Sequence, residues 1–93
     1  MDSLRFLIHF EFSFMIRFRV KELLAEKGFK ERRIVTIAEV AEATGIHRIT
    51  LSKIANHPGY NTGTENLDRL CKYFACRLED VAQFVADLPE EGA

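Results

Sequence analysis

The chain has 93 residues, of which 47% are hydrophobic and 29% charged, and its formal net charge at pH 7 is −1. This length allows one small domain with a single hydrophobic core and is too short for two domains. A net charge near zero is poor support for a strongly charged partner, and two cysteines do not indicate a disulfide scaffold.

The charges are unevenly distributed along the chain. Residues 16–56 hold nine basic and five acidic residues, a net of +4, whereas residues 57–93 hold three basic and seven acidic residues, a net of −4. A positive half of this kind suits a phosphate-facing surface. Ordinary solvated helix faces can produce the same imbalance, so the charge pattern alone leaves both interpretations open.

The first fifteen residues alternate between apolar and polar side chains from Ile8 onward. A period of two residues predicts a β-strand. The segment does not resemble a secretory signal peptide, because Arg5, His9 and Glu11 interrupt its apolar run. It is also too short and too polar to cross a membrane.

A single strand with an aromatic face needs a partner, and the rest of the chain is predicted to be helical. We therefore predict that residues 5–14 pair with the same strand of a second copy. The dimer interface would then be formed by the apolar side of this strand: Ile8, Phe10, Phe12 and Phe14. The alternative is that residues 1–14 are an over-extended start, and both interpretations remain open.

The first predicted helix begins near Val20, has apolar residues at helical spacing, and ends near Lys27, where Gly28 stops it. A basic loop, residues 29–35, follows and returns the chain to the core through its final apolar pair.

Residues 36–56 predict two short helices joined by a glycine-centred turn. Thr36 can cap the first helix, and Glu39 stands three residues later, as a capping box requires. Gly45 can adopt the left-handed conformation that ends a helix. Leu51 and Ile54 give the second helix an apolar inner face. This pattern is typical of a helix-turn-helix, whose second helix enters the DNA major groove.

A turn-rich loop, residues 57–63, leads to a fourth helix that Thr62 or Thr64 caps. A fifth helix is predicted from about Leu78 to Val85, and Leu88 and Pro89 end it. Cys71 and Cys76 are expected to be buried small hydrophobic residues.

The central segment resembles the Cro and lambda-repressor-like (Xre-type) DNA-binding domains. The resemblance rests on a small residue, the turn glycine and three core apolar residues: Ala41, Gly45, Ile46, Leu51 and Ile54. Residues 66–81 resemble the fourth and fifth helices of the same family, and the likeness extends from about Arg17 to Leu88. It implies an all-α, compact four- or five-helix fold, to which the N-terminal β-strand is added. The expected organisation is an N-terminal extension at 1–15, a helix-turn-helix domain at 16–88 and an acidic tail at 89–93.

By resemblance, DNA bases are read by the exposed side of the second motif helix, residues 47–56: Arg48, Ile49, Ser52 and Lys53. Arg48 stands at the first base-contacting position and could grip guanine O6 and N7. Ile49 departs from the polar residue common in the family, and either packs on a thymine methyl or is half-buried.

The resemblance also assigns contacts with the DNA backbone, which position the protein without reading sequence. The expected residues lie beside the motif helices or in the following loop: Arg32, Arg33, Thr36, His47, Asn56, Tyr60 and Asn61. At two positions near these contacts, this chain has a different residue from the one common in the family. Ile37 replaces a common glutamine, and His47 replaces the usual serine or threonine cap. Core filling is the alternative role for Tyr60.

No phosphate-binding glycine loop, nucleophile elbow or metal-ligand spacing is present, so we expect no enzyme activity, cofactor or metal. The predicted function is a cytoplasmic, sequence-specific transcriptional regulator that binds double-stranded DNA, as a homodimeric repressor on a palindromic operator. The alternative is a protein-interaction module, antitoxin-like or an adaptor, on the same fold.

Overall fold

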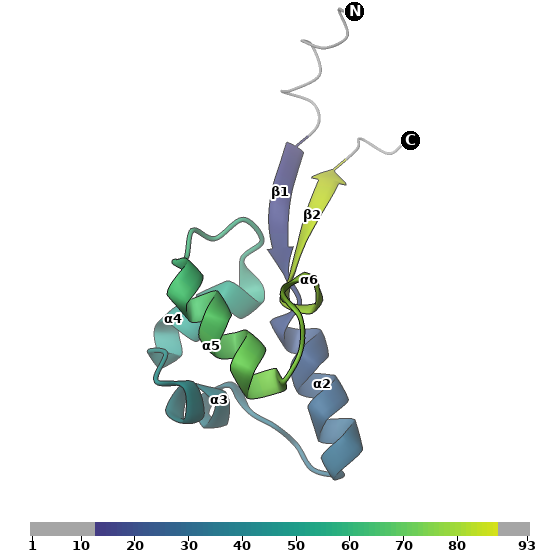
Figure 1. Ribbon diagram of the computed structural model, residues 1–93, viewed down its shortest axis with the longest axis vertical. Helices are drawn as coiled ribbons and strands as arrows, with labels where there is room; N and C mark the ends of the chain where they lie inside the picture. Colours follow the sequence, from purple (N-terminus) through teal and green to yellow (C-terminus); the bar gives the residue numbers. More distant parts are fainter. Residues whose placement is uncertain (1–12, 88–93) are drawn as a thin grey trace, which may run out of the picture.

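The computed structural model describes residues 13–87. Its elements, in chain order, are β1 (Ser13–Phe18), α2 (Val20–Glu31), α3 (Ile37–Thr44), α4 (Arg48–Asn56), α5 (Thr64–Phe74), α6 (Leu78–Val81) and β2 (Ala82–Asp87). Figure 1 shows the helices gathered in one body, from which the two strands project together as a ribbon. The predicted helical fold with an N-terminal strand is confirmed.

The core of the helical body is formed by apolar side chains from every helix. Leu51, Val40 and Leu70 are fully buried, and they come from α4, α3 and α5. Val20 of α2 and Val81 of α6 are equally inaccessible. The helices therefore share one core, and each contributes the apolar positions that its 3.6-residue period brings to one side.

The first helix is longer than predicted, because α2 continues through Gly28 to Glu31. Gly28 is needed for a close approach of the chain after the helix. A Cβ atom at this position would lie 2.6 Å from the carbonyl oxygen of Arg33. The N–H of Arg33 in turn donates to the Gly28 carbonyl at 3.0 Å. The residue after the helix, Arg32, is its C-cap and adopts a left-handed conformation with φ of 58°.

A strand is present at the N-terminal end of the described residues, and the prediction that the rest of the chain offers it no partner was wrong. β1 pairs antiparallel with β2 of the same chain, with Ile16 opposite Phe84 and Phe18 opposite Ala82. Phe14, one of the four predicted interface residues, lies opposite Ala86 in this register. The other three, Ile8, Phe10 and Phe12, lie outside the described residues, as does most of the segment 5–14.

The prediction of a fifth helix through Val85 was also wrong. α6 has four residues, and the chain becomes extended at Ala82. Phe84 and Val85 are strong strand formers, and β1 supplies them with backbone partners more than sixty residues away in sequence. The expected boundary between residues 15 and 16 falls inside β1, and the tail 89–93 lies outside the described residues.

The fourth helix of the prediction, α5, is not capped by a threonine. Its N-cap residue is Gly63, which has no side chain to accept from the first turn. The Thr62 hydroxyl instead accepts a hydrogen bond from the Asn66 side-chain amide at 2.9 Å. This contact stabilises the loop before the helix rather than a free N–H of the helix.

Candidate nucleic-acid interface

The turn between α3 and α4 sets the direction of the second motif helix. Gly45 ends α3 with φ of 80°, in the left-handed region that glycine adopts without a Cβ clash. The Thr44 hydroxyl donates to the Val40 carbonyl at 2.7 Å and accepts from the Ile46 N–H at 3.2 Å. Ile46 is 3% exposed, so its side chain anchors the turn in the core. The predicted helix-turn-helix is therefore formed.

The start of α3 follows the prediction in part: Thr36 is the cap, but the Glu39 carboxylate binds Arg33 instead of the Thr36 N–H, so the predicted capping box is only half formed. The Thr36 hydroxyl accepts from the N–H of Glu39 at 3.1 Å, which satisfies one of the free N–H groups of the first turn. Val35 before the cap and Val40 after it are both buried, as a hydrophobic staple requires.

α4 has one buried and one exposed side. Leu51, Ile54 and Ala55 face the core. The predicted base-reading residues lie on the other side, where Arg48, Ile49 and Lys53 are exposed and Ser52 is half-buried. Ile49 is 61% exposed, which decides between its two predicted environments in favour of solvent. The four residues therefore share one accessible helix face.

The positive charges on this face have no counter-ions. Within residues 13–87, neither Arg48 nor Lys53 forms an ion pair or a side-chain hydrogen bond. On α5, by contrast, Arg69 pairs with Glu65 at 2.7 Å and Lys72 pairs with Asp68 at 3.0 Å. The positive charges of Arg48 and Lys53 on α4 are thus not neutralised within the described residues, so they could bind a polyanion.

The two ends of α4 are held by its own side chains. His47 is the N-cap residue, and its Nδ1 atom accepts from the N–H of Ile49 at 3.2 Å. The histidine therefore occupies the cap position at which the family usually has serine or threonine. At the other end, the Asn56 side-chain amide donates to the Ser52 carbonyl at 2.9 Å. Both residues are exposed and stand at the two ends of the helix that carries the predicted base-reading residues.

Arg33, predicted to contact the DNA backbone, is held by two carboxylates. Its Nη1 and Nη2 atoms donate to the two Glu39 oxygens at 2.8 and 2.6 Å, and Nε donates to Glu31 at 2.8 Å. Glu31 also accepts from Lys27 at 2.8 Å. The hydrogen bonds from Arg33 lower the pKa of Glu39, and those from Lys27 and then Arg33 lower the pKa of Glu31.

This network joins the end of α2 to the start of α3, and the sequence reasoning missed it. The available signal was the presence of Glu31 among the basic residues of 30–33, just before the cap. A phosphate group would have to displace Glu39 from Arg33 before it could bind there.

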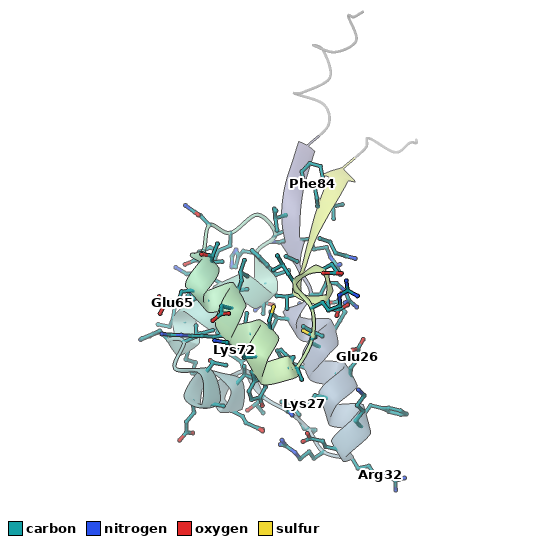
Figure 2. The ribbon with its side chains drawn as sticks, in the orientation of Figure 1. Glu26, Lys27, Arg32, Glu65, Lys72 and Phe84 are labelled. Atoms are coloured by element: carbon teal, nitrogen blue, oxygen red, sulfur yellow. The ribbon has the colours of Figure 1, made fainter. Side chains whose placement is uncertain are left out.

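The other residues predicted to contact the DNA backbone do not lie together. Figure 2 shows Arg32 at the far end of α2, across the view from α4, so the fold does not bring it beside the predicted base-reading residues. Tyr60 is half-buried and packs against the core, in keeping with its alternative role. Asn61, the next residue, is exposed.

Neither a metal site nor a reactive thiol is apparent in the described part of the chain. No three metal-ligating side chains gather there. Cys71 and Cys76 are half-buried, as free thiols, and burial raises the pKa of Cys76. Between Ser13 and Asp87, no helix has the length and apolar character to cross a membrane.

Comparison with known proteins agrees with this geometry. The sequence profile of the Cro/C1-type HTH DNA-binding domain matches residues 19–87. The structure is similar to the crystal structure of the transcriptional regulator VanUg (Form II), with a TM-score of 0.62 and 19% sequence identity, over 77% of this chain and 87% of that one. No curated protein matches the chain. The matched profile spans α2 to β2, and the chain therefore belongs to the Cro/C1-type HTH DNA-binding family.

Proposed function

We propose that this protein is a transcriptional repressor that binds a palindromic operator as a homodimer and reads sequence with α4. The observation that carries the proposal is the exposed face of α4, where Arg48 and Lys53 lack counter-ions while the opposite face is fixed in the core. A rigid helix with unpaired positive charge on its free side suits the major groove, which admits one α-helix.

In this proposal, Arg48 donates two hydrogen bonds to guanine O6 and N7. Ile49 packs on a thymine methyl group, since its exposed side chain has no polar atom to read an edge. Ser52 and Lys53, one turn later, contact the next bases or a phosphate. Thr36 and His47 are the N-cap residues of α3 and α4, where backbone N–H groups and the helix dipole favour a phosphate. Asn56, at the C-terminal end of α4, would contact a phosphate through its side-chain amide alone.

The protein would act by binding alone. The proposal assigns it no catalytic step and no cofactor, and places it with DNA in the cytoplasm. Repression follows if the bound dimer occupies DNA that other proteins need.

The test begins with selection of bound sequences from a random duplex pool by the full chain. We expect Arg48→Ala to weaken binding to the selected site by about 1–3 kcal/mol and to flatten the preference at one position in each half-site. Arg77→Ala is the matched control, because Arg77 is an exposed arginine at the N-cap of α6 and pairs with Glu79.

Competition binding between selected and scrambled duplexes provides the measurement. Equal losses for Arg48→Ala and Arg77→Ala would mean that the arginine contributes only charge. A chain that selects no sequence and retards no duplex at low salt would contradict the proposed function.

A further inference from the structure

The ribbon has one face made of apolar residues. In an antiparallel pair, residues opposite each other project to the same side. The register places Ile16 with Phe84 and Phe18 with Ala82 on one side. On the other side, Arg17 lies opposite Gln83 and donates to its side-chain oxygen at 2.8 Å. The first face is apolar at every described pair, whereas the opposite face is mixed, because it carries the pair Met15–Val85 between two polar pairs.

The apolar side is buried at its base and accessible farther out. Phe18 is 8% exposed and belongs to the core, whereas Ile16 is 46% and Phe84 71% exposed. Figure 2 shows Phe84 on the projecting part of the ribbon, well away from the helices. A hollow of about 610 Å³ lies next to the ribbon. It is separate from a first hollow of about 710 Å³ beside α2.

This second hollow continues the apolar side onto the helical body. Its lining includes Tyr60 of the loop, Leu67 of α5 and Leu78 of α6, which is 55% exposed. We call the accessible apolar residues at the hollow, Ile16, Leu78, Ala82 and Phe84, the ribbon face.

The lining of this hollow contains no Asp, Glu, Lys or Arg among the described residues. An uncharged surface gives no attraction for a polyanion, so DNA is not its occupant. It also gives no charge pattern by which an acidic or basic protein segment would be selected. The surface suits an equally uncharged apolar partner.

We propose that the ribbon face is covered by the ribbon face of a second copy of this chain, related by a twofold axis. The same surface on two copies meets itself without like-charge repulsion. The chain has twelve further residues before Ser13, and Ile8, Phe10 and Phe12 continue in sequence the even-numbered apolar positions of Phe14 and Ile16. The sequence of each copy therefore contains more apolar residues of the same spacing.

The inference rests on the proposed function in one respect, since a palindromic operator requires two copies. It changes the predicted interface, because the strand pairs within its own chain and the contact between copies is made by the face of the ribbon. Backbone hydrogen bonds between copies are not needed.

Sedimentation equilibrium of the full chain, over a range of micromolar concentrations and without DNA, tests the interface. We expect a monomer–dimer equilibrium for the parent chain. Phe84→Glu should raise the dissociation constant at least about tenfold, since each dimer would bury two carboxylates. Gln83→Glu is the matched control: it adds the same charge at the neighbouring position on the opposite face, and dimerisation should be nearly unchanged.

Leu78→Glu provides an independent variant, because Leu78 belongs to α6 and not to the ribbon. Circular dichroism checks that each variant is folded, and if Phe84→Glu is unfolded, Leu78→Glu decides. A monomeric parent chain would overturn the proposal. So would a dimer that both substitutions leave intact, or one that Gln83→Glu weakens equally.

Retardation of duplex DNA separates the two proposals. A monomeric parent chain that still selects a DNA sequence would overturn the interface and leave the DNA-reading helix in place. A dimer that is sensitive to Phe84→Glu but binds no duplex would support the interface and contradict the DNA-binding function.

Discussion

The helical body and the ribbon use their apolar residues in opposite ways. In the body, Leu51, Val40 and Leu70 are inaccessible to solvent. In the ribbon, Phe84 and Ile16 retain 71% and 46% of their exposure. Both regions follow a regular sequence period, so the difference lies in what covers each apolar side.

The two regions differ because their backbone groups find hydrogen-bond partners at different distances along the chain. Each helix forms its backbone hydrogen bonds locally and needs only one side covered, and the neighbouring helices cover it. The ribbon obtains backbone partners from the opposite end of the chain, and only its base, at Phe18, reaches the core. A two-stranded ribbon is marginal by itself, which makes its outer part dependent on further contacts.

The largest expected effect contrasts one apolar residue from each region. Leu51→Ala should lower the free energy of unfolding by about 2–5 kcal/mol, because it leaves a cavity in a filled core. Phe84→Ala should cost about 0.5 kcal/mol or less in the monomer, as for a surface site. Urea denaturation of both variants measures the difference.

Protein concentration sharpens this contrast. If copies associate through the ribbon face, the loss for Phe84→Ala should grow with concentration, whereas the loss for Leu51→Ala should not. If both variants lost the same free energy of unfolding at every protein concentration, the ribbon would belong to the same cooperative core as the helices.

A smaller effect is expected at the junction of α2 and α3. Gly28→Ala places a Cβ atom 2.6 Å from the Arg33 carbonyl oxygen, so the backbone has to shift. We expect a loss of about 1–3 kcal/mol, as for other overpacked sites. Gly63→Ala is the control, since its Cβ would meet nothing within 4 Å. Thermal unfolding that is equally unaffected in both variants would show that the loop after α2 relaxes freely.

The smallest effect is expected for the loss of the N-cap of α3 in the helical body. Thr36→Ala removes the hydroxyl that accepts from the Glu39 N–H and should cost about 1 kcal/mol. Thr64→Ala is the control, because Thr64 is exposed and α5 has no side-chain cap. A melting temperature for Thr36→Ala that equals that of Thr64→Ala would show that this cap adds no stability.

The sequence was sufficient to predict the features that depend on neighbouring residues. Thr36 caps α3 and Gly45 turns the chain, because each acts on groups within a few residues of itself. The shared exposed face of Arg48 and Lys53 follows from helical spacing alone. Gly28 misled the prediction, since a helix-breaking glycine and a glycine required for close packing look the same in sequence.

The candidate interface was predicted less completely than the fold. The pairing of Arg33 with Glu39 needed the actual path of the chain between α2 and α3. The position of Arg32, away from α4, likewise depends on where α2 ends. Side chains on loops are oriented by contacts that no periodic pattern records.

By itself, the sequence determined the helix-turn-helix, its inner apolar side and its basic outer side, because helix formation and capping are local. Only the tertiary structure decided that β1 pairs with β2. Ala82–Asp87 carries apolar residues at spacings that suit either a helix or a strand, so its local sequence does not choose. The choice was made by β1, whose unpaired N–H and C=O groups needed partners that this extended segment could supply.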